Sequence, residues 1–236
     1  MYKRQVNTPV NLGKTEYDAV QFGVEKRYSH GYQARLSYTY SKGRGNTSGN
    51  GAPGSNFQVL NDMHLELNEG PTDFDRPHNL VFSAAAVVPK THGLLFSTVV
   101  RYVSGTPFTV QDTTLDNDRN GINFDPLPAG TYSGSGSGNG LNAITVDSKG
   151  GRNGARGPDF FQADARLGYR IKVRGERKVE LFAEVFNLTD RANFANPNGD
   201  RLPGTDGKVA IDFLRTVTLR AGAGPRTAQF GARLEF

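Results

Sequence analysis

The chain of 236 residues contains no cysteine and no tryptophan, and it has no long apolar run. The absence of cysteine excludes disulfide bonds, thiol catalysis, iron–sulfur clusters and cysteine-based zinc sites within this chain. The longest mostly apolar stretch is Leu80–Val88, which Ser83 interrupts. Because a membrane-spanning helix needs about 18 or more apolar residues, the sequence excludes such a helix.

The first residues lack the apolar segment of a secretory signal. Lys3 and Arg4 are basic, but Val6-Asn7-Thr8-Pro9 follows them where a signal would have roughly 7–15 apolar residues. We therefore expect either a cytoplasmic protein or a chain whose natural beginning lies further upstream.

Glycine and proline are abundant, with 29 and 12 residues, and 28 basic residues against 23 acidic ones give a net charge of +5. This composition alone is typical of a glycine-rich soluble β protein. The basic residues are interleaved with acidic ones, and they form neither a basic helix nor an aromatic-basic stripe. We therefore expect no nucleic-acid partner.

Apolar and polar residues alternate with a period of two in seven segments, and alternation of this kind predicts β-strands. The last segment is the clearest, because its apolar face consists of Ala228, Phe230, Ala232, Leu234 and Phe236. Several segments have about ten residues, which is the length of a tilted strand that crosses a bilayer. We predict strands over residues 17–26, 32–40, 78–88, 94–103, 160–171, 178–187 and 226–236.

Short and long connections alternate strictly between these strands. The short ones cover residues 27–31, 89–93 and 172–177, and the long ones cover 41–77, 104–159 and 188–225. An antiparallel meander with all its short turns at one end gives this order. It is the plan of outer-membrane barrels, which have short periplasmic turns and long extracellular loops.

Charged residues of the strands fall on the face opposite the apolar one. We predict that this charged face points inward and that the apolar face contacts outer-membrane lipid. A soluble antiparallel sheet alternates too, but the strand lengths and the order of the loops favour the membrane. The predicted inward residues are Arg35, Arg101, Arg166, Arg170, Arg233, Asp164, Glu180 and Glu184. Aromatic residues predicted at the two rims are Tyr28 and Tyr32 at one, and Tyr38, Tyr40, Tyr102 and Phe161 at the other.

Five segments, in this order, resemble the C-terminal part of TonB-dependent outer-membrane receptors of the Oar-like type, which carry a carboxypeptidase-regulatory-like domain. The resemblance covers most of the chain from about Tyr17. The segments are Tyr32–Ser41 (YQARLSYTYS), Asp73–Ser83 (DFDRPHNLVFS), Leu94–Phe108 (ending in SGTPF), Arg152–Gly157 (RNGARG) and Phe182–Phe194 (FAEVFNLTDRANF).

The resemblance implies an all-β fold, namely an antiparallel transmembrane β-barrel meander. About seven strands would belong to a larger barrel of about 22 strands with a plugged lumen. The chain would then be a fragment, with the plug and the segment that contacts the TonB complex upstream. Phe230, Leu234 and Phe236 would form the signal for the barrel-assembly machinery. The three long loops would contact an extracellular ligand that the sequence does not identify.

One segment partly matches a calcium-binding loop. Asp116, Asp118, Asn120 and Asp125 supply oxygen ligands, and Gly121 would allow the sharp turn. The glutamate expected at the twelfth position is Leu127, and no flanking helices are evident, so a solvated turn is the favoured interpretation. His30, His64, His78 and His92 have no metal-ligand spacing. We expect no cofactor other than this Ca²⁺ alternative, and no catalytic residue, so we do not expect an enzyme.

Three functions remain open from the sequence. The first is the barrel of a TonB-dependent transporter in the bacterial outer membrane. The second is a structural or adhesive barrel protein of the same fold, whose loops bind other cells or matrix. The third is a soluble β-domain.

Overall fold

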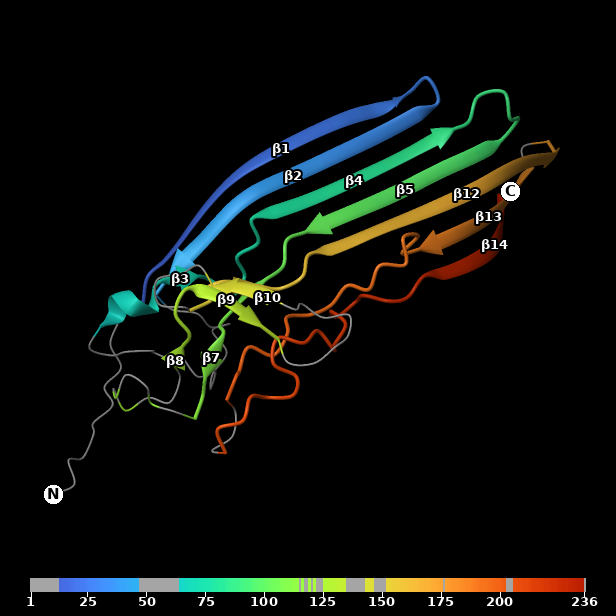
Figure 1. Ribbon diagram of the computed structural model, residues 1–236. Helices are drawn as coiled ribbons and strands as arrows, with labels where there is room; N and C mark the ends of the chain where they lie inside the picture. The colour runs from blue at the N-terminus through green and yellow to red at the C-terminus, as the bar shows by residue number, and fades with distance from the viewer. Residues whose placement is uncertain are drawn as a thin grey trace.

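Seven long strands follow one another as an antiparallel meander in one curved sheet (Figure 1). The computed structural model describes residues 13–46, 64–114, 116, 119, 121, 125–134, 143–146, 152–175, 177–202 and 206–235. The strand order is β1-β2-β4-β5-β12-β13-β14, so every long strand pairs with its neighbours along the chain. The seven are β1 (Thr15–Ser29), β2 (Tyr32–Gly45), β4 (His78–Val87), β5 (Leu94–Val103), β12 (Phe160–Arg174), β13 (Arg177–Phe186) and β14 (Thr227–Glu235). The all-β antiparallel meander predicted from the alternation is confirmed.

The strand ends differ from the prediction mainly in the first hairpin and in β12. The strand predicted over residues 32–40 continues to Gly45, and the one predicted over 17–26 covers Thr15–Ser29. The extra residues of β2 pair with the first residues of β1, from Thr15 opposite Gly45 to Ala19 opposite Ser41. Alternation ends there because both faces are polar, but backbone pairing continues. The strand predicted over 160–171 likewise runs to Arg174, where it pairs with Arg177.

All short turns lie at one end of the sheet, and all long connections lie at the other (Figure 1). The first hairpin closes with only His30 and Gly31 between paired residues Ser29 and Tyr32. Both turn residues have positive φ, 55° and 86°. Two such residues make the type of turn whose twist matches that of a hairpin, and glycine adopts it without strain.

The long connections are folded, whereas the sequence predicted loops over their whole length. We call the described residues of 46–77, 104–159 and 187–226 the first, second and third loops, and together the loop layer. The first contains the 3-10 helix η1 (Leu65–Asn68) and β3 (Gly70–Pro71), which pairs with the end of β2. The second contains three small ladders: β6 (Pro107–Phe108) with β11 (Ala155–Arg156), β7 (Gln111–Asp112) with β8 (Asp125–Pro126), and β9 (Gly130–Ser133) with β10 (Ala143–Val146).

The buried apolar residues of the described chain lie in the loop layer and not in the long strands. Val110, Leu127 and Ala155 of the second loop pack with Phe213 and Leu214 of the third. On the long strands the burial of apolar and charged side chains is reversed, since Glu180 is 5 % exposed whereas Phe230 is 85 % exposed. A sheet that exposes its apolar face and shields its charges is unfavourable in water and favourable in lipid.

None of the described segments forms a long apolar helix of the kind that could cross a membrane.

Candidate functional site

Ion pairs cover one face of the last strands of the sheet. Arg166 lies between two carboxylates, with Nη2 2.7 Å from Glu180 Oε1 and Nη1 2.8 Å from Glu184 Oε1. Arg170 Nη2 lies 3.3 Å from the second oxygen of Glu180, so that carboxylate is shared by two guanidinium groups. The strand register places all eight residues predicted as inward on this same face, which we call the charged face. Charges on a face that lipid never contacts can be kept at little cost.

An aromatic residue within this charged face is explained by two glycines. Phe182 stands opposite Gly168 on β12 and Gly231 on β14. A Cβ atom at Gly231 would lie 2.9 Å from ring atoms of Phe182, which is closer than van der Waals contact allows. The guanidinium of Arg166 covers the ring at 3.9 Å from its centroid. The two glycines therefore make room for the ring, which packs under a cation.

Apolar side chains and an aromatic row mark the opposite face, which we call the apolar face. Tyr38, Leu80, Tyr102 and Phe161 form one row across four strands near the loop layer. Tyr32 lies six residues from Tyr38 along β2, or roughly 20 Å in an extended strand. Aromatic rows at this separation bound the apolar band of outer-membrane barrels. Phe230 and Leu234 of the predicted assembly signal also lie on this face, opposite Ala183 and Val179, and Phe236 lies outside the described residues.

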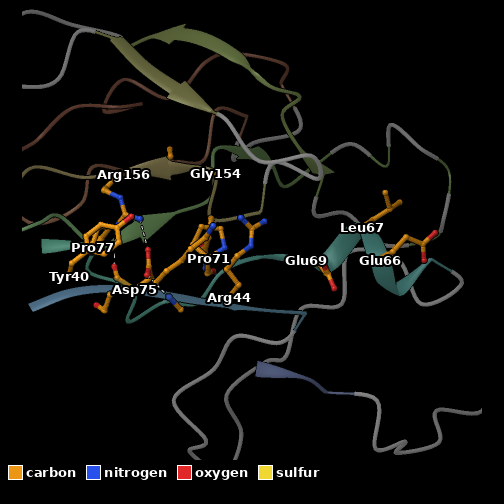
Figure 2. A pocket seen from close by; sticks show the side chains of 15 residues that line it. Tyr40, Arg44, Glu66, Leu67, Glu69, Pro71, Asp75, Pro77, Gly154 and Arg156 are labelled. Atoms are coloured by element: carbon orange, nitrogen blue, oxygen red, sulfur yellow. Dashed lines mark hydrogen bonds and ion pairs between the residues drawn. The ribbon is translucent and has the colours of Figure 1, made fainter. Parts of the chain in front are cut away.

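A cavity of about 690 Å³ opens where β2 meets the loop layer (Figure 2). Residues of β2, the first loop and the second loop line it, so it follows the boundary between the two loops. Its described lining carries charges of both signs, among them Lys42, Arg44, Glu66, Glu69 and Arg156. A cavity with this lining suits a polar ligand or a polar segment of a partner.

Asp75 and Arg156 form the central contact at this boundary (Figure 2). Arg156 Nη2 donates to Asp75 Oδ2 at 2.6 Å, and its Nη1 donates to the backbone oxygens of Asp75 at 2.9 Å and Gly105 at 2.8 Å. The other carboxylate oxygen of Asp75 accepts the backbone N–H of Gly43 at 2.7 Å. The Asp75 side chain is 4 % exposed and that of Arg156 is 32 % exposed. This ion pair therefore joins β2, the first loop and the second loop.

Arg152 and Asn153 reinforce the same contact from the second loop. Asn153 Nδ2 donates to Asp73 Oδ1 at 2.7 Å and to the backbone oxygen of Pro71 at 2.9 Å. Arg152 Nη1 donates to the backbone oxygens of Asn68 and Gly45. Burial lowers the pKa of Arg152, and nearby Asp73 raises it in part. We call Asp73, Asp75, Arg152, Asn153 and Arg156 the clasp.

The clasp joins two of the segments singled out in the sequence. Asp73 and Asp75 belong to DFDRPHN, and Arg152, Asn153 and Arg156 belong to RNGARG. The sequence did not reveal that they meet, since about 80 residues separate them. Opposite charges in two short, polar, distinctive segments are the signal that could have suggested it.

A second ion pair, which sequence reasoning also missed, joins the second and third loops. Arg201 donates to both oxygens of Asp112, at 2.9 and 2.6 Å, and the Asp112 side chain is almost fully buried. This two-point contact holds the pKa of Arg201 above its ordinary value. Close by, the backbone N–H of Gln111 donates to Gly199 and that of Arg201 donates to Gln111.

The segment that partly matches a calcium-binding loop is only partly described. Asp116 Oδ2 accepts the backbone N–H of Gly121 at 2.9 Å, while Asp118 and Asn120 lie outside the described residues. Asp125 lies opposite Asp112, the carboxylate that Arg201 binds. Among the residues that the structure describes, no group of three or more His, Cys, Asp or Glu side chains could hold a metal ion.

Comparison with known proteins gives one match. A family model described as an outer membrane beta barrel domain matches residues 2–229. No curated protein and no solved structure matches the chain significantly.

Proposed function

Because the chain belongs to the outer membrane beta barrel domain family, we propose that it forms part of the barrel of a TonB-dependent receptor. The protein lies in the bacterial outer membrane, so its apolar face contacts lipid and its charged face lines the lumen. The receptor takes up an extracellular ligand, and the TonB complex supplies the energy through a plug outside this chain. The chain itself has no catalytic role in this proposal.

The observation that carries the proposal is the charged face. Arg166, Arg170, Glu180 and Glu184 fill their side of the sheet with ion pairs. The interior of a small barrel is filled by packed side chains, whereas a wide barrel encloses water or a plug. A lumen wall of hydrogen-bonded charges suits a wide barrel, in which a polar plug packs against that wall.

The open edges of the sheet also favour a larger barrel. Within the described residues, β1 and β14 each have a neighbour on one side only. With seven strands in an antiparallel meander, β1 and β14 run in the same direction and cannot close as an antiparallel pair. Unpaired strand edges are not tolerated in lipid, so closure needs an odd number of further strands. A barrel of about 22 strands meets this condition.

In this proposal, the loop layer is the part of the chain that contacts the ligand. It is folded, and it surrounds a cavity lined by charges at the extracellular end of β2. During insertion into the membrane, the barrel-assembly machinery recognises Phe230 and Leu234 on the apolar face of β14. The family match assigns neither ligand binding nor assembly recognition, so both roles are part of this proposal.

Binding to TonB tests the proposal directly. The full-length protein, extracted in detergent from its own bacterium, is titrated with the soluble periplasmic domain of that bacterium's TonB. We expect saturable binding that a plugless outer-membrane barrel from the same membrane does not show. Binding no stronger than that of the control would overturn the proposal, and cell–cell adhesion lost on deletion of the gene would then support the adhesive alternative.

A further inference from the structure

A groove on the apolar face of the sheet runs along β4, at the end where the short turns lie, and has a volume of about 480 Å³. The lining residues on this face are Tyr32, Ala34, Phe82, Ala84, Ala86 and Phe96. In the floor of the groove, Ala84 lies opposite Ala34 of β2. Ala86 continues the floor between Tyr32 of β2 and Phe96 of β5, whose rings form the two walls. The groove exists because small side chains on β4 lie between large ones on both neighbouring strands.

The mouth of the groove lies between the first two short turns, which a hydrogen bond joins. His30 of the first turn and Pro89 of the second line this end of the groove. Val87 N donates to Gly31 O at 2.7 Å, so the ends of the two hairpins are held side by side. The opening is thus formed by the fold itself, as binding sites for small molecules usually are.

Basic residues lie at this mouth, and neither turn carries an acidic one. Residues 26–34 and 87–93 contain no aspartate or glutamate, and their cations and histidines are Lys26, Arg27, His30, Lys90 and His92. Lys26 Nζ lies 4.0 Å from the centroid of the Tyr32 ring and donates to Ser29 Oγ at 2.6 Å, so its charge is fixed beside one wall. Lys90 is exposed and follows Pro89 directly. The mouth therefore attracts an anionic group.

The position of the groove in the membrane identifies what fills it. The short turns of outer-membrane barrels face the periplasm, and aromatic residues such as Tyr32 lie at the level of the lipid headgroups. An acyl chain can therefore lie along the alanine floor, with its phosphate at the level of the two turns. Lipid chains are as apolar as the side chains around them, so close packing and charge, and not the hydrophobic effect, select a bound lipid over its neighbours.

We propose that the groove binds an anionic phospholipid of the periplasmic leaflet, with one acyl chain between Tyr32 and Phe96 and the phosphate at Lys90 and the basic residues of the first turn. The walls confine the chain on both sides, and the cations favour phosphatidylglycerol over zwitterionic phosphatidylethanolamine. This inference rests on the membrane location of the sheet. It is independent of ligand uptake, so a full-length protein that does not bind TonB leaves it unaffected.

Photo-crosslinking tests the site in the full-length protein, reconstituted in phosphatidylethanolamine vesicles that contain a trace of a phospholipid with a photoreactive acyl chain. Mass spectrometry then maps the labelled residues. With a phosphatidylglycerol probe, we expect labelling to concentrate between residues 82 and 96, at about five times the yield of a phosphatidylethanolamine probe. Excess inorganic phosphate should leave this labelling unchanged, because the acyl chain is part of what binds.

Two pairs of variants separate the groove from the rest of the sheet. Ala84→Phe fills the floor and should abolish labelling there, whereas Ala163→Phe, on the same face of β12 opposite Val100, should leave it unchanged. Lys90→Gln should lower the preference for phosphatidylglycerol about fivefold, whereas Arg177→Gln at the third short turn should not. Because Lys90 lies in an exposed turn, its variant keeps the test decisive if Ala84→Phe fails to assemble. Even labelling along the apolar face, equal yields from the two probes, or displacement by inorganic phosphate would overturn the proposal.

Discussion

In the sheet, apolar side chains lie on the exposed face and charged ones are shielded, whereas in the loop layer apolar side chains are buried. Phe230 on β14 and Leu214 in the third loop mark the two extremes, at 85 % and 0 % exposed. Both arrangements occur in one chain of ordinary hydrophilic composition. The difference follows from the surroundings, since lipid contacts the apolar face of the sheet and water surrounds the loop layer.

The comparison also shows where stability comes from in each region. The sheet depends on continuous backbone pairing and on ion pairs of the charged face, and lipid takes the place of a core. The loop layer has a small core of its own, formed between segments about 100 residues apart. Substitutions of the same kind should therefore have different effects in the two regions.

The largest difference is expected for leucine-to-alanine substitutions. Leu214→Ala leaves a cavity in the apolar core of the loop layer and should destabilise the loop layer by about 2–5 kcal/mol. Leu167→Ala on the apolar face of β12 leaves no cavity, because lipid fills the space, and should cost less. Limited proteolysis of the loops measures the first, and the temperature at which the folded gel band disappears measures the second. Equal resistance of both variants to protease would break the comparison.

An added charge should have different energetic costs on the two faces of the sheet. Leu167→Arg places a guanidinium in lipid and should cost about 2–4 kcal/mol near the bilayer centre. Gln33→Arg places the same group on the charged face and should cost below about 1 kcal/mol. The amount of folded protein in the outer membrane, resolved by gel mobility without heating, measures both. Equal loss of folded protein in the two variants would contradict the assignment of the faces.

A smaller effect is expected from a single methyl group on the charged face. Gly231→Ala brings a Cβ against the ring of Phe182 and should cost roughly 1–3 kcal/mol. Gly23→Ala is the control, because its Cβ would meet only the backbone oxygen of Leu36 at 4.0 Å. Thermal unfolding of the barrel compares them. If Phe182→Leu does not relieve the cost of Gly231→Ala, the packing explanation is wrong.

The smallest effect is expected at the weakest ion pair of the charged face. Arg101 lies 3.5 Å from Asp164 and is nearly half exposed, so Arg101→Gln should cost below about 1 kcal/mol. Arg166→Gln removes two shorter contacts and leaves the buried Glu180 with a weaker partner, so it should cost more. The same thermal assay ranks the two variants. A larger loss of stability for Arg101→Gln than for Arg166→Gln would contradict this account of the charged face.

The sheet could be predicted from the sequence because its pattern is local. Alternation in segments such as Phe161–Ile171 fixes both the strand and its two faces, and strict alternation of connection lengths predicts the meander. The extension of β2 through Lys42, Gly43 and Arg44 was missed because alternation ends where both faces leave the lipid.

The loop layer could not be predicted because its contacts are distant in sequence and have no period. Val110 and Leu214 meet across about 100 residues, and no pattern marks either of them as buried. Asp75 and Arg156 lie in segments that the resemblance singled out, but a resemblance names segments without saying which of them touch. The proposed assembly signal stays a prediction, and so does the solvated turn favoured over a calcium loop, since Phe236, Asp118 and Asn120 lie outside the described residues.

The central claim is that the two faces of the sheet meet lipid and lumen, and site-directed spin labelling tests it directly in a background from which any cysteine outside this cysteine-free chain has been removed. Single cysteines placed from Ala163 to Ile171 in the full-length protein, spin-labelled in lipid vesicles, report contact with oxygen in lipid or with a water-soluble nickel complex. We predict alternation, with the labels at residues 163, 165, 167, 169 and 171 exposed to oxygen and those between them exposed to nickel. Uniform exposure to nickel, or alternation in the opposite phase, would contradict the account.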